Sequence, residues 1–174
     1  MNNWGIIGIG RIGLSMARNM SDKGMSISLY DKVFENKSDP FFDQKKLYPE
    51  LEKASVFNDI SNFIQSIESP RKILILVPSG KPNEDVINYL IKILNDNDII
   101  IDAGNTNPLI SYNNKLKIAK NKILYLGIGV SGGVKGVLEG PSIMIGGDKS
   151  AFKKVKDDLA LITSKTIDNS NSYD

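Results

Sequence analysis

Short apolar runs alternate along the chain with longer stretches in which apolar residues recur every three or four positions. The short runs have the length of buried strands, as in Trp4–Ile9 and Lys72–Val77. The longer stretches have the spacing of amphipathic helices; Ile87, Leu90 and Leu94, for example, fall on one face of such a helix. We expect strands at Trp4–Ile9, Ser26–Tyr30, Ala54–Phe57, Lys72–Val77, Asp98–Asp102, Ile123–Gly129 and Ser142–Ile145, and helices at Ile12–Lys23, Asp59–Ile67, Asn83–Leu94, Pro108–Ala119 and Lys149–Leu161.

This alternation predicts one α/β domain over residues 1–174, with a mainly parallel sheet and helices on both of its faces. The segment Asp31–Glu52 interrupts the pattern, because it is polar and contains Pro40 and Pro49. We expect a loop there, with room for one short helix. The polar end of the chain, Asp168–Asp174, is expected to fray.

A glycine-rich turn, Gly8-Ile-Gly10-Arg-Ile-Gly13, follows the first expected strand and opens the first expected helix. Gly8 allows a tight turn, Gly10 lets a diphosphate approach the backbone, and Gly13 lets the helix pack closely on the strand. Asp31 ends the second strand, where a carboxylate accepts a hydrogen bond from an adenosine ribose. The pattern therefore predicts dinucleotide binding. The alternative is a purely structural turn, with Asp31 as a solvated strand end.

The residues around Asp31 also bear on the choice of cofactor. A carboxylate there binds a free 2′-hydroxyl and repels a 2′-phosphate, which favours NAD over NADP. Lys32 could offset part of this repulsion, although one Lys does not reproduce a bidentate Arg. Arg11 either contacts the diphosphate or is a solvated residue of the first helical turn, and the sequence leaves both open.

Small, glycine-bearing or polar loops follow the other expected strands. They are Pro78–Gly80, Ala103–Thr106 and Val130–Gly133. Since ligands of open parallel sheets bind at the carboxyl ends of the strands, we expect these loops to form one binding rim. Asn105 could orient a hydroxylated substrate or a nicotinamide amide, or could simply be a turn residue with a left-handed backbone. Ser131 and the N–H groups after it could form a nest for an anion.

The composition limits which kinds of catalytic and metal site are possible. The 174 residues include no His and no Cys, which excludes a Ser-His-Asp triad, imidazole and thiolate metal sites, and disulfides. Catalysis would need Lys, Asp, Glu, Tyr, Ser or a bound cofactor, and we expect no metal site. The net charge of +2 gives no case for nucleic-acid or membrane-surface binding. With apolar runs too short to span a bilayer and no signal-peptide pattern at the start, we expect a cytoplasmic protein.

Four stretches carry a resemblance to a known family: GIGRIG at Gly8–Gly13, VPSG at Val77–Gly80, DIIIDAGNT at Asp98–Thr106, and GVSGGVKGVLEGPSIMIGGD at Gly129–Asp148. Together they resemble, in order and over nearly the whole chain, the amino-terminal dinucleotide-binding domain of 6-phosphogluconate dehydrogenases. The shorter, NAD-preferring branch of that family is the more similar one. The resemblance implies a Rossmann-like, doubly wound α/β fold and NAD or NADP as cofactor.

The resemblance also implies residue roles and a reaction. The reaction is oxidation of 6-phosphogluconate at its 3-hydroxyl, followed by loss of carbon dioxide to give ribulose 5-phosphate, in the pentose phosphate pathway. The cofactor would contact Gly8, Ile9, Gly10, Arg11, Ile12, Gly13, Asp31, Lys32, Val77, Pro78, Ser79 and Asn105, and the sugar acid would contact Asn105, Ser131, Gly132 and Gly133.

One departure from the family affects the expected activity. In the family, the general base, the general acid and most phosphate ligands belong to a following all-helical domain, which is absent from this sequence. No residue of 1–174 therefore takes a catalytic acid or base role by position, and we expect the chain to bind cofactor without turnover. Since that domain also builds most of the family's homodimer, we expect a monomer or weak association.

Two other functions compete with this interpretation. A β-hydroxyacid dehydrogenase of the 3-hydroxyisobutyrate type shares the fold and the glycine turn. That family usually has Ser-Ser or Ser-Thr at the positions of Gly104-Asn105, and Thr-Leu at those of Pro141-Ser142. Both differences favour the first family. The other possibility is a non-catalytic nucleotide-binding module.

Overall fold

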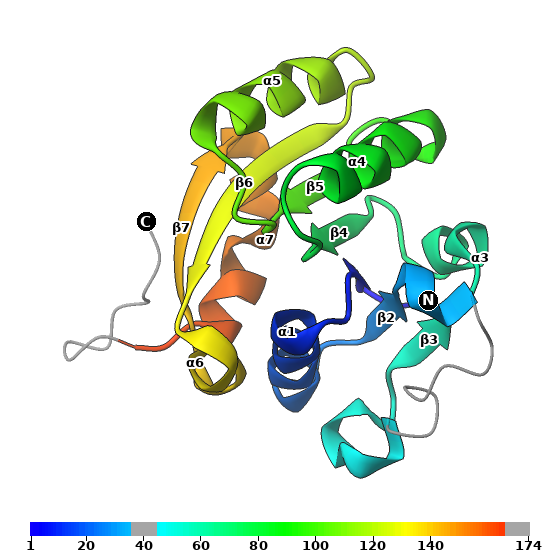
Figure 1. Ribbon diagram of the computed structural model, residues 1–174, viewed down its shortest axis with the longest axis vertical. Helices are drawn as coiled ribbons and strands as arrows, with labels where there is room; N and C mark the ends of the chain where they lie inside the picture. Colours follow the sequence, from blue (N-terminus) through cyan, green and yellow to red (C-terminus); the bar gives the residue numbers. More distant parts are fainter. Residues whose placement is uncertain (36–44, 166–174) are drawn as a thin grey trace.

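A seven-stranded sheet forms the centre of the computed structural model, which describes residues 1–35 and 45–165 (Figure 1). Pro40 and Asp168–Asp174 lie outside the described residues. No helix in the described residues has both the length and the apolar character needed to cross a bilayer. The strands are β1 (Trp4–Ile7), β2 (Ile27–Tyr30), β3 (Ser55–Phe57), β4 (Lys72–Ile75), β5 (Ile99–Asp102), β6 (Leu124–Ser131) and β7 (Ser142–Gly147), and the helices are α1 (Arg11–Asp22), α3 (Ile60–Gln65), α4 (Lys81–Ile93), α5 (Pro108–Ala119), α6 (Gly133–Glu139) and α7 (Lys149–Ile162).

The strand order is β3-β2-β1-β4-β5-β6-β7. The neighbouring strands from β3 to β6 are parallel, and β7 alone runs antiparallel, beside β6. From β1 the chain first builds outward through β2 to β3, and then returns to build outward from β4 on the other side. The strands β1 and β4 therefore meet at a topological switch point, where open α/β sheets bind ligands. The mainly parallel, doubly wound α/β fold is confirmed.

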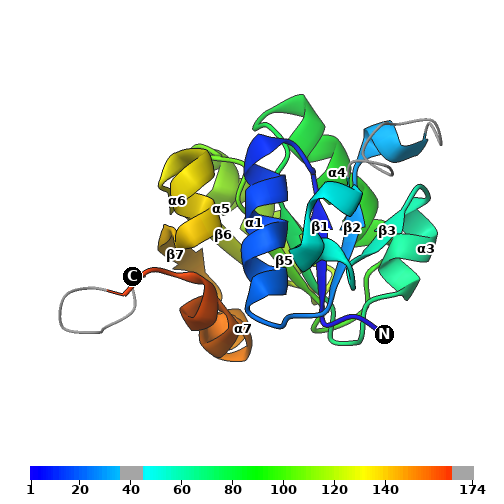
Figure 2. The ribbon, with the colours of Figure 1, turned by 90° about the horizontal axis from the view of Figure 1, so that it is seen from below.

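Helices cover both faces of the sheet (Figure 2). One apolar cluster joins α1, α6 and α7 to one face, and a second joins α3, α4 and α5 to the other. The three isoleucines of β5 are fully buried because Ile99 and Ile101 belong to the first cluster and Ile100 to the second. Burial of each isoleucine side chain contributes about 1.5–3 kcal/mol to the stability of the fold. Because both faces of this strand are covered, its apolar residues stand at consecutive positions.

Several element boundaries differ by one or two residues from those expected from the pattern, and three strand ends show the cause. The strands expected to reach Ile9 and Val77 end at Ile7 and Ile75, because the chain turns away from the sheet at its carboxyl edge. The strand expected to end at Gly129 continues to Ser131, because its antiparallel pairing with β7 extends as far as Ser131 opposite Ser142.

Several short helices also differ from the expectation. Helix α6 was not expected, because seven residues with two glycines show no helical period; it forms by burying Val137 in the cluster that contains α1. Within the expected loop Asp31–Glu52, the described residues form short 3₁₀ helices at Lys32–Glu35, Lys45–Leu47 and Pro49–Leu51, where one short helix was expected.

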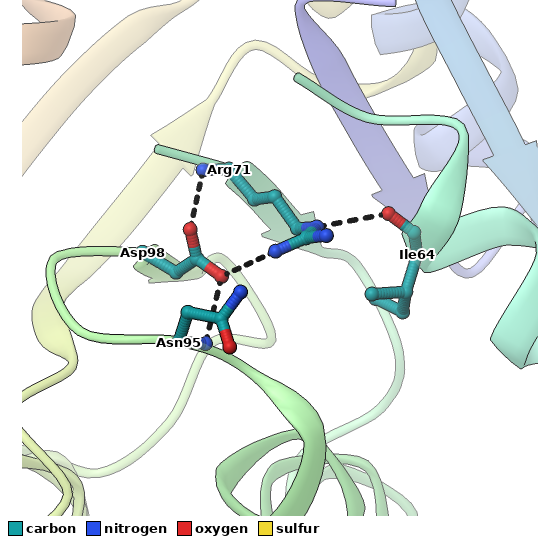
Figure 3. Close-up of polar contacts among 4 residues, drawn as sticks. All are labelled: Ile64, Arg71, Asn95 and Asp98. Carbon is teal, nitrogen blue, oxygen red and sulfur yellow. Dashed lines mark hydrogen bonds and ion pairs between the residues drawn. The ribbon is translucent and has the colours of Figure 1, made fainter. Parts of the chain in front are cut away.

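A buried carboxylate ties elements together at the amino-terminal edge of the sheet (Figure 3). Asp98 is fully buried and accepts hydrogen bonds from the Arg71 N–H at 2.7 Å, Arg71 Nη1 at 3.1 Å and the Asn95 N–H at 3.0 Å. Arg71 Nε donates to the Ile64 carbonyl oxygen at 2.9 Å. These contacts join α3, α4 and the starts of β4 and β5, far from the switch point's carboxyl edge.

Replacing Asp98 by Asn is expected to lower the free energy of unfolding by about 2–4 kcal/mol, because an amide removes the charge and turns a donor toward groups that are all donors. Urea denaturation followed by circular dichroism measures this. Asp96→Asn is the control, since the ion pair of Asp96 with Lys122 is exposed and contributes about 0–1 kcal/mol. Equal stability of the two variants would contradict the assignment.

Candidate functional site

A groove of about 700 Å³ lies along the carboxyl edge of the sheet at the switch point. The turns after β1, β2, β4 and β5 form its floor, and α6 contributes to its wall. Its size is that of a cofactor or small-molecule site. It brings together most of the residues expected to contact a cofactor or substrate: Gly8, Gly10, Arg11, Ile12, Gly13, Asp31, Lys32, Val77, Pro78, Asn105 and Gly133.

Each glycine of the turn has a distinct reason to lack a side chain. A Cβ at Gly13 would lie 1.9 Å from the Gly8 carbonyl oxygen, so only glycine lets α1 start against the end of β1. Gly8 has φ of 94°, a left-handed conformation that L side chains rarely adopt. A Cβ at Gly10, in contrast, would meet no atom of the protein within 4 Å. The space beside Gly10 belongs to the groove and is available to a ligand.

The amino end of α1 faces this open space without a side-chain cap. Gly10 is the N-cap and supplies no side-chain hydrogen bond, and the first turn holds no acidic residue. The first N–H groups of a helix have no partner within it, and the helix dipole favours an anion there. Arg11 stands in this turn, where a cation is unfavourable unless an anion lies nearby. The end of α1 is therefore suited to a diphosphate.

Asp31 is held at the β2 end of the groove by the backbone. Its Oδ2 accepts from the Ile9 N–H at 2.7 Å and its Oδ1 accepts from the Val33 N–H at 3.2 Å. A carboxylate has about four acceptor positions, so both oxygens keep capacity for a ribose hydroxyl. Ile9 thus acts through its N–H on Asp31 and does not line the groove. The exposed side chain of Lys32 lies beside this carboxylate.

Asn105 marks the other end of the groove, in the turn after β5. It adopts φ of 58°, the left-handed conformation that the sequence left as one interpretation. Next to it, a Cβ on Gly104 would lie 2.7 Å from the Val77 carbonyl oxygen, so the turn packs directly on the β4 loop. Asn105 also lines a second cavity of about 420 Å³, between α5 and the strands β6 and β7.

The length of the groove follows from the sheet. The strands run in the order β2-β1-β4-β5, so Asp31 and Asn105 follow strands separated by three inter-strand spacings. At about 4.8 Å each, these spacings put the two ends about 14 Å apart. An extended ligand with one end at Asp31 would therefore cross the glycine turn before it reached Asn105.

Besides Ile9, three of the expected contact residues do not line the groove. Ser79 is exposed in the turn between β4 and α4. Ser131 and Gly132 are exposed at the end of β6 and before α6. The expectation that Val130–Gly133 forms a loop is wrong, because Ser131 ends a strand and Gly133 begins α6.

Other residues that line the groove escaped the sequence analysis as individual contacts. Leu76 and Ala103 directly follow β4 and β5, and their position after a strand is the signal that could have found them. Pro82 lies in the first turn of α4. Val137 carried no usable signal, because it depends on the unexpected helix α6.

The chain matches one family model over nearly all of its length. The model describes the NAD binding domain of 6-phosphogluconate dehydrogenase and matches residues 3–169. The decarboxylating 6-phosphogluconate dehydrogenases of Staphylococcus epidermidis RP62A and Staphylococcus aureus N315 are each 36% identical to this chain over 167 residues, 94% of it and 34% of the relative. The chain thus spans about a third of the length of these curated relatives.

Solved structures agree with the family model. Plasmodium falciparum 6-phosphogluconate dehydrogenase, studied in its apo form and with its cofactor NADP⁺ or its substrate 6-phosphogluconate, superposes with a TM-score of 0.88 at 28% identity, over 99% of this chain and 36% of that one. Mycobacterium tuberculosis 3-hydroxyisobutyrate dehydrogenase has a TM-score of 0.75 at 19% identity, over 94% of this chain and 52% of that one, which shows a shared fold. From the family model and these relatives, the chain belongs to the family of NAD-binding domains of 6-phosphogluconate dehydrogenase.

Proposed function

We propose that this chain binds NAD in the switch-point groove, as the cofactor-binding part of a decarboxylating 6-phosphogluconate dehydrogenase. The observation that carries the proposal is the groove itself, with an uncapped helix end beside the open face of Gly10 and a fixed carboxylate at Asp31. The names of the relatives supply the reaction, and the P. falciparum enzyme binds a nicotinamide cofactor and 6-phosphogluconate.

In this proposal each part of the groove holds one part of the cofactor. The diphosphate lies on the N–H groups of Gly10–Gly13, with Arg11 as its cationic partner. The adenosine ribose meets Asp31 and Lys32, and the nicotinamide ribose meets Asn105. The turn Val77–Ser79 would run along the cofactor between them. The anionic sugar acid would bind at Asn105 and at the exposed backbone of Ser131, Gly132 and Gly133.

The chain's own groups would orient the reactants and not move the protons. When bound, the cofactor would supply an acceptor for the hydride on the carbon that bears the 3-hydroxyl of the sugar acid, and the proton of that hydroxyl would go to a general base. Along the groove, the ionisable side chains in the described part of the chain are Arg11, Asp31 and Lys32, all on the turns after β1 and β2. They lie two or three strand spacings from Asn105, about 10–14 Å. That distance is too long for direct proton transfer by these three side chains, because a general base must come within hydrogen-bond reach. Nearer to Asn105, in the second cavity, Asp102 and Tyr125 are buried and Lys115 forms an ion pair with Asp148.

NAD is the favoured cofactor because of the charge at Asp31. The carboxylate is fixed by two backbone N–H groups, so it cannot turn away from a 2′-phosphate at the same ribose. Repulsion between like charges a few ångströms apart at a protein surface amounts to a few kcal/mol before screening. Lys32 is exposed and flexible, and compensates only part of this repulsion.

Titration of the purified chain with NADH and NADPH tests both parts of the proposal. NADH is expected to bind at least about tenfold more tightly than NADPH, or about 1.4 kcal/mol. Asp31→Asn is expected to remove most of this difference, because it weakens the binding of NADH and removes the repulsion that opposes the binding of NADPH. Nicotinamide fluorescence and Trp4 fluorescence both report binding. Failure of both cofactors to bind would overturn the proposed function, and tighter binding of NADPH would overturn the preference alone.

Gly10→Ala tests the position of the diphosphate. Gly10 has φ of −68°, and a methyl group there meets no protein atom, so the free energy of unfolding is expected to stay within about 0.5 kcal/mol. The methyl group would occupy ligand space, and NADH affinity is expected to fall about tenfold or more. Gly136→Ala, which adds the same group where it also meets no atom and outside the groove lining, is the matched control. Unchanged affinity in Gly10→Ala would exclude this binding mode.

The purified chain is expected to bind NADH without oxidising 6-phosphogluconate. The reason is the distance between its ionisable groove residues and Asn105. Absorbance at the NADH band, with 6-phosphogluconate and NAD at saturating concentration, measures the rate. A steady rate that depends on both reactants and on Asn105 would show that the chain supplies its own acid and base.

A further inference from the structure

A buried carboxylate stands at the carboxyl end of β5, directly beneath the Asn105 turn. Asp102 is 2% exposed and accepts four hydrogen bonds. Its Oδ1 accepts from Asn83 Nδ2 at 2.8 Å and from the Gly104 N–H at 3.0 Å. Its Oδ2 accepts from Thr106 Oγ1 at 3.1 Å and from Tyr125 OH at 3.0 Å. These bonds use two acceptor positions on each oxygen, the usual capacity of a carboxylate.

The four donors come from three parts of the fold. Asn83 belongs to α4 and Tyr125 to β6, so they anchor the carboxylate to the body of the domain. Gly104 and Thr106 are the residues immediately before and after Asn105. Asp102 therefore holds both neighbours of a residue whose own backbone is left-handed, with φ of 58°, a conformation that Asn tolerates better than most residues but adopts less readily than glycine.

The arrangement needs an ionised acceptor. A buried charge without partners is very costly. In the described residues Asp102 forms no ion pair, and its four hydrogen-bond donors compensate the charge instead. Burial, and then the negative charge of Asp102, raise the pKa of the Tyr125 hydroxyl, so it stays protonated and remains a donor. An apolar residue such as the neighbouring Ile101 would fill a buried strand position without this cost.

Asn105 is the residue that makes this arrangement relevant to function. It lines both the groove and the second cavity, so its orientation affects ligands at the junction of the two. We propose that Asp102 is a positioning residue, which fixes the Gly104–Thr106 turn so that Asn105 points its amide at the nicotinamide end of the groove. The inference rests on the proposed cofactor site, and it adds a residue that contacts neither cofactor nor substrate in that site.

A double-mutant cycle tests whether Asp102 acts through Asn105. NADH affinity is measured for the unmodified chain, Asp102→Asn, Asn105→Ala and the double variant. Each single variant is expected to bind NADH at least fivefold more weakly, and the double variant is expected to match the weaker single variant within twofold. Normal affinity in Asp102→Asn, normal affinity in Asn105→Ala, or losses that multiply in the double variant would each overturn the proposal.

Asp98→Asn is the matched control for that cycle. It makes the same change to a buried carboxylate at the other end of β5, away from the groove. At a temperature where circular dichroism shows it folded, it is expected to bind NADH within twofold of the unmodified chain. A loss of NADH affinity as large as that of Asp102→Asn would mean that Asp102 only stabilises the fold, and would overturn the proposal.

Amide hydrogen exchange tests the same inference without any ligand. In Asp102→Asn, and in the milder variant Thr106→Val should the first fail to fold, the Gly104 amide is expected to exchange at least tenfold faster. The amides of Ile100 and Ile101 are expected to keep their rates. Unchanged exchange at Gly104, or equal acceleration throughout β5, would overturn the proposal. Because this measurement needs no cofactor, it distinguishes failure of the positioning role from failure of NADH binding.

Discussion

The contact between the first turn of α1 and the end of β1 is the constraint on which the site depends. With no side chain at Gly13, the helix begins against the Gly8 carbonyl oxygen, and its uncapped N–H groups open into the groove. The same approach brings the Ile9 N–H to Asp31, which links the first two strands at their carboxyl ends. The helix end, the groove floor and the Asp31 carboxylate are thus placed by one close approach of backbone to backbone.

Buried or half-buried aspartates accept backbone N–H groups at several strand ends, and the consequence differs with the edge of the sheet. Asp98 compensates backbone and guanidinium donors at the amino edge, where its contacts stabilise the junction of four elements. Asp31 and Asp102 accept backbone N–H groups at the carboxyl edge, where the loops they hold border the groove. Strand ends leave donors that the ladder does not use, and a carboxylate satisfies them more strongly than a neutral acceptor.

The sheet also separates binding from reactivity. Its strand order spaces Asp31, the glycine turn and Asn105 in sequence along the edge, so an extended dinucleotide would be read from one end to the other. The groove's ionisable side chains gather at the β1 and β2 end, and the polar but neutral Asn105 stands at the opposite end. Under the proposed function, a domain built in this way would orient a cofactor along the sheet edge, with its charged groups at the end away from Asn105.

The sequence by itself determined the kinds of elements, the mainly parallel α/β fold, the glycine turn and the place of Asp31, because each depends on periodicity or on residues next to a strand. It did not reveal α6, whose formation depends on burying Val137 in the cluster that contains α1, or the extension of β6, which depends on pairing with β7. Nor could it join Asp102 to Asn83 and Tyr125, or Asp98 to Arg71, since these partners lie 19 to 27 positions apart. Contacts between distant segments form only when the sheet brings them together, so the tertiary structure alone decided how the turn bearing Asn105 is held.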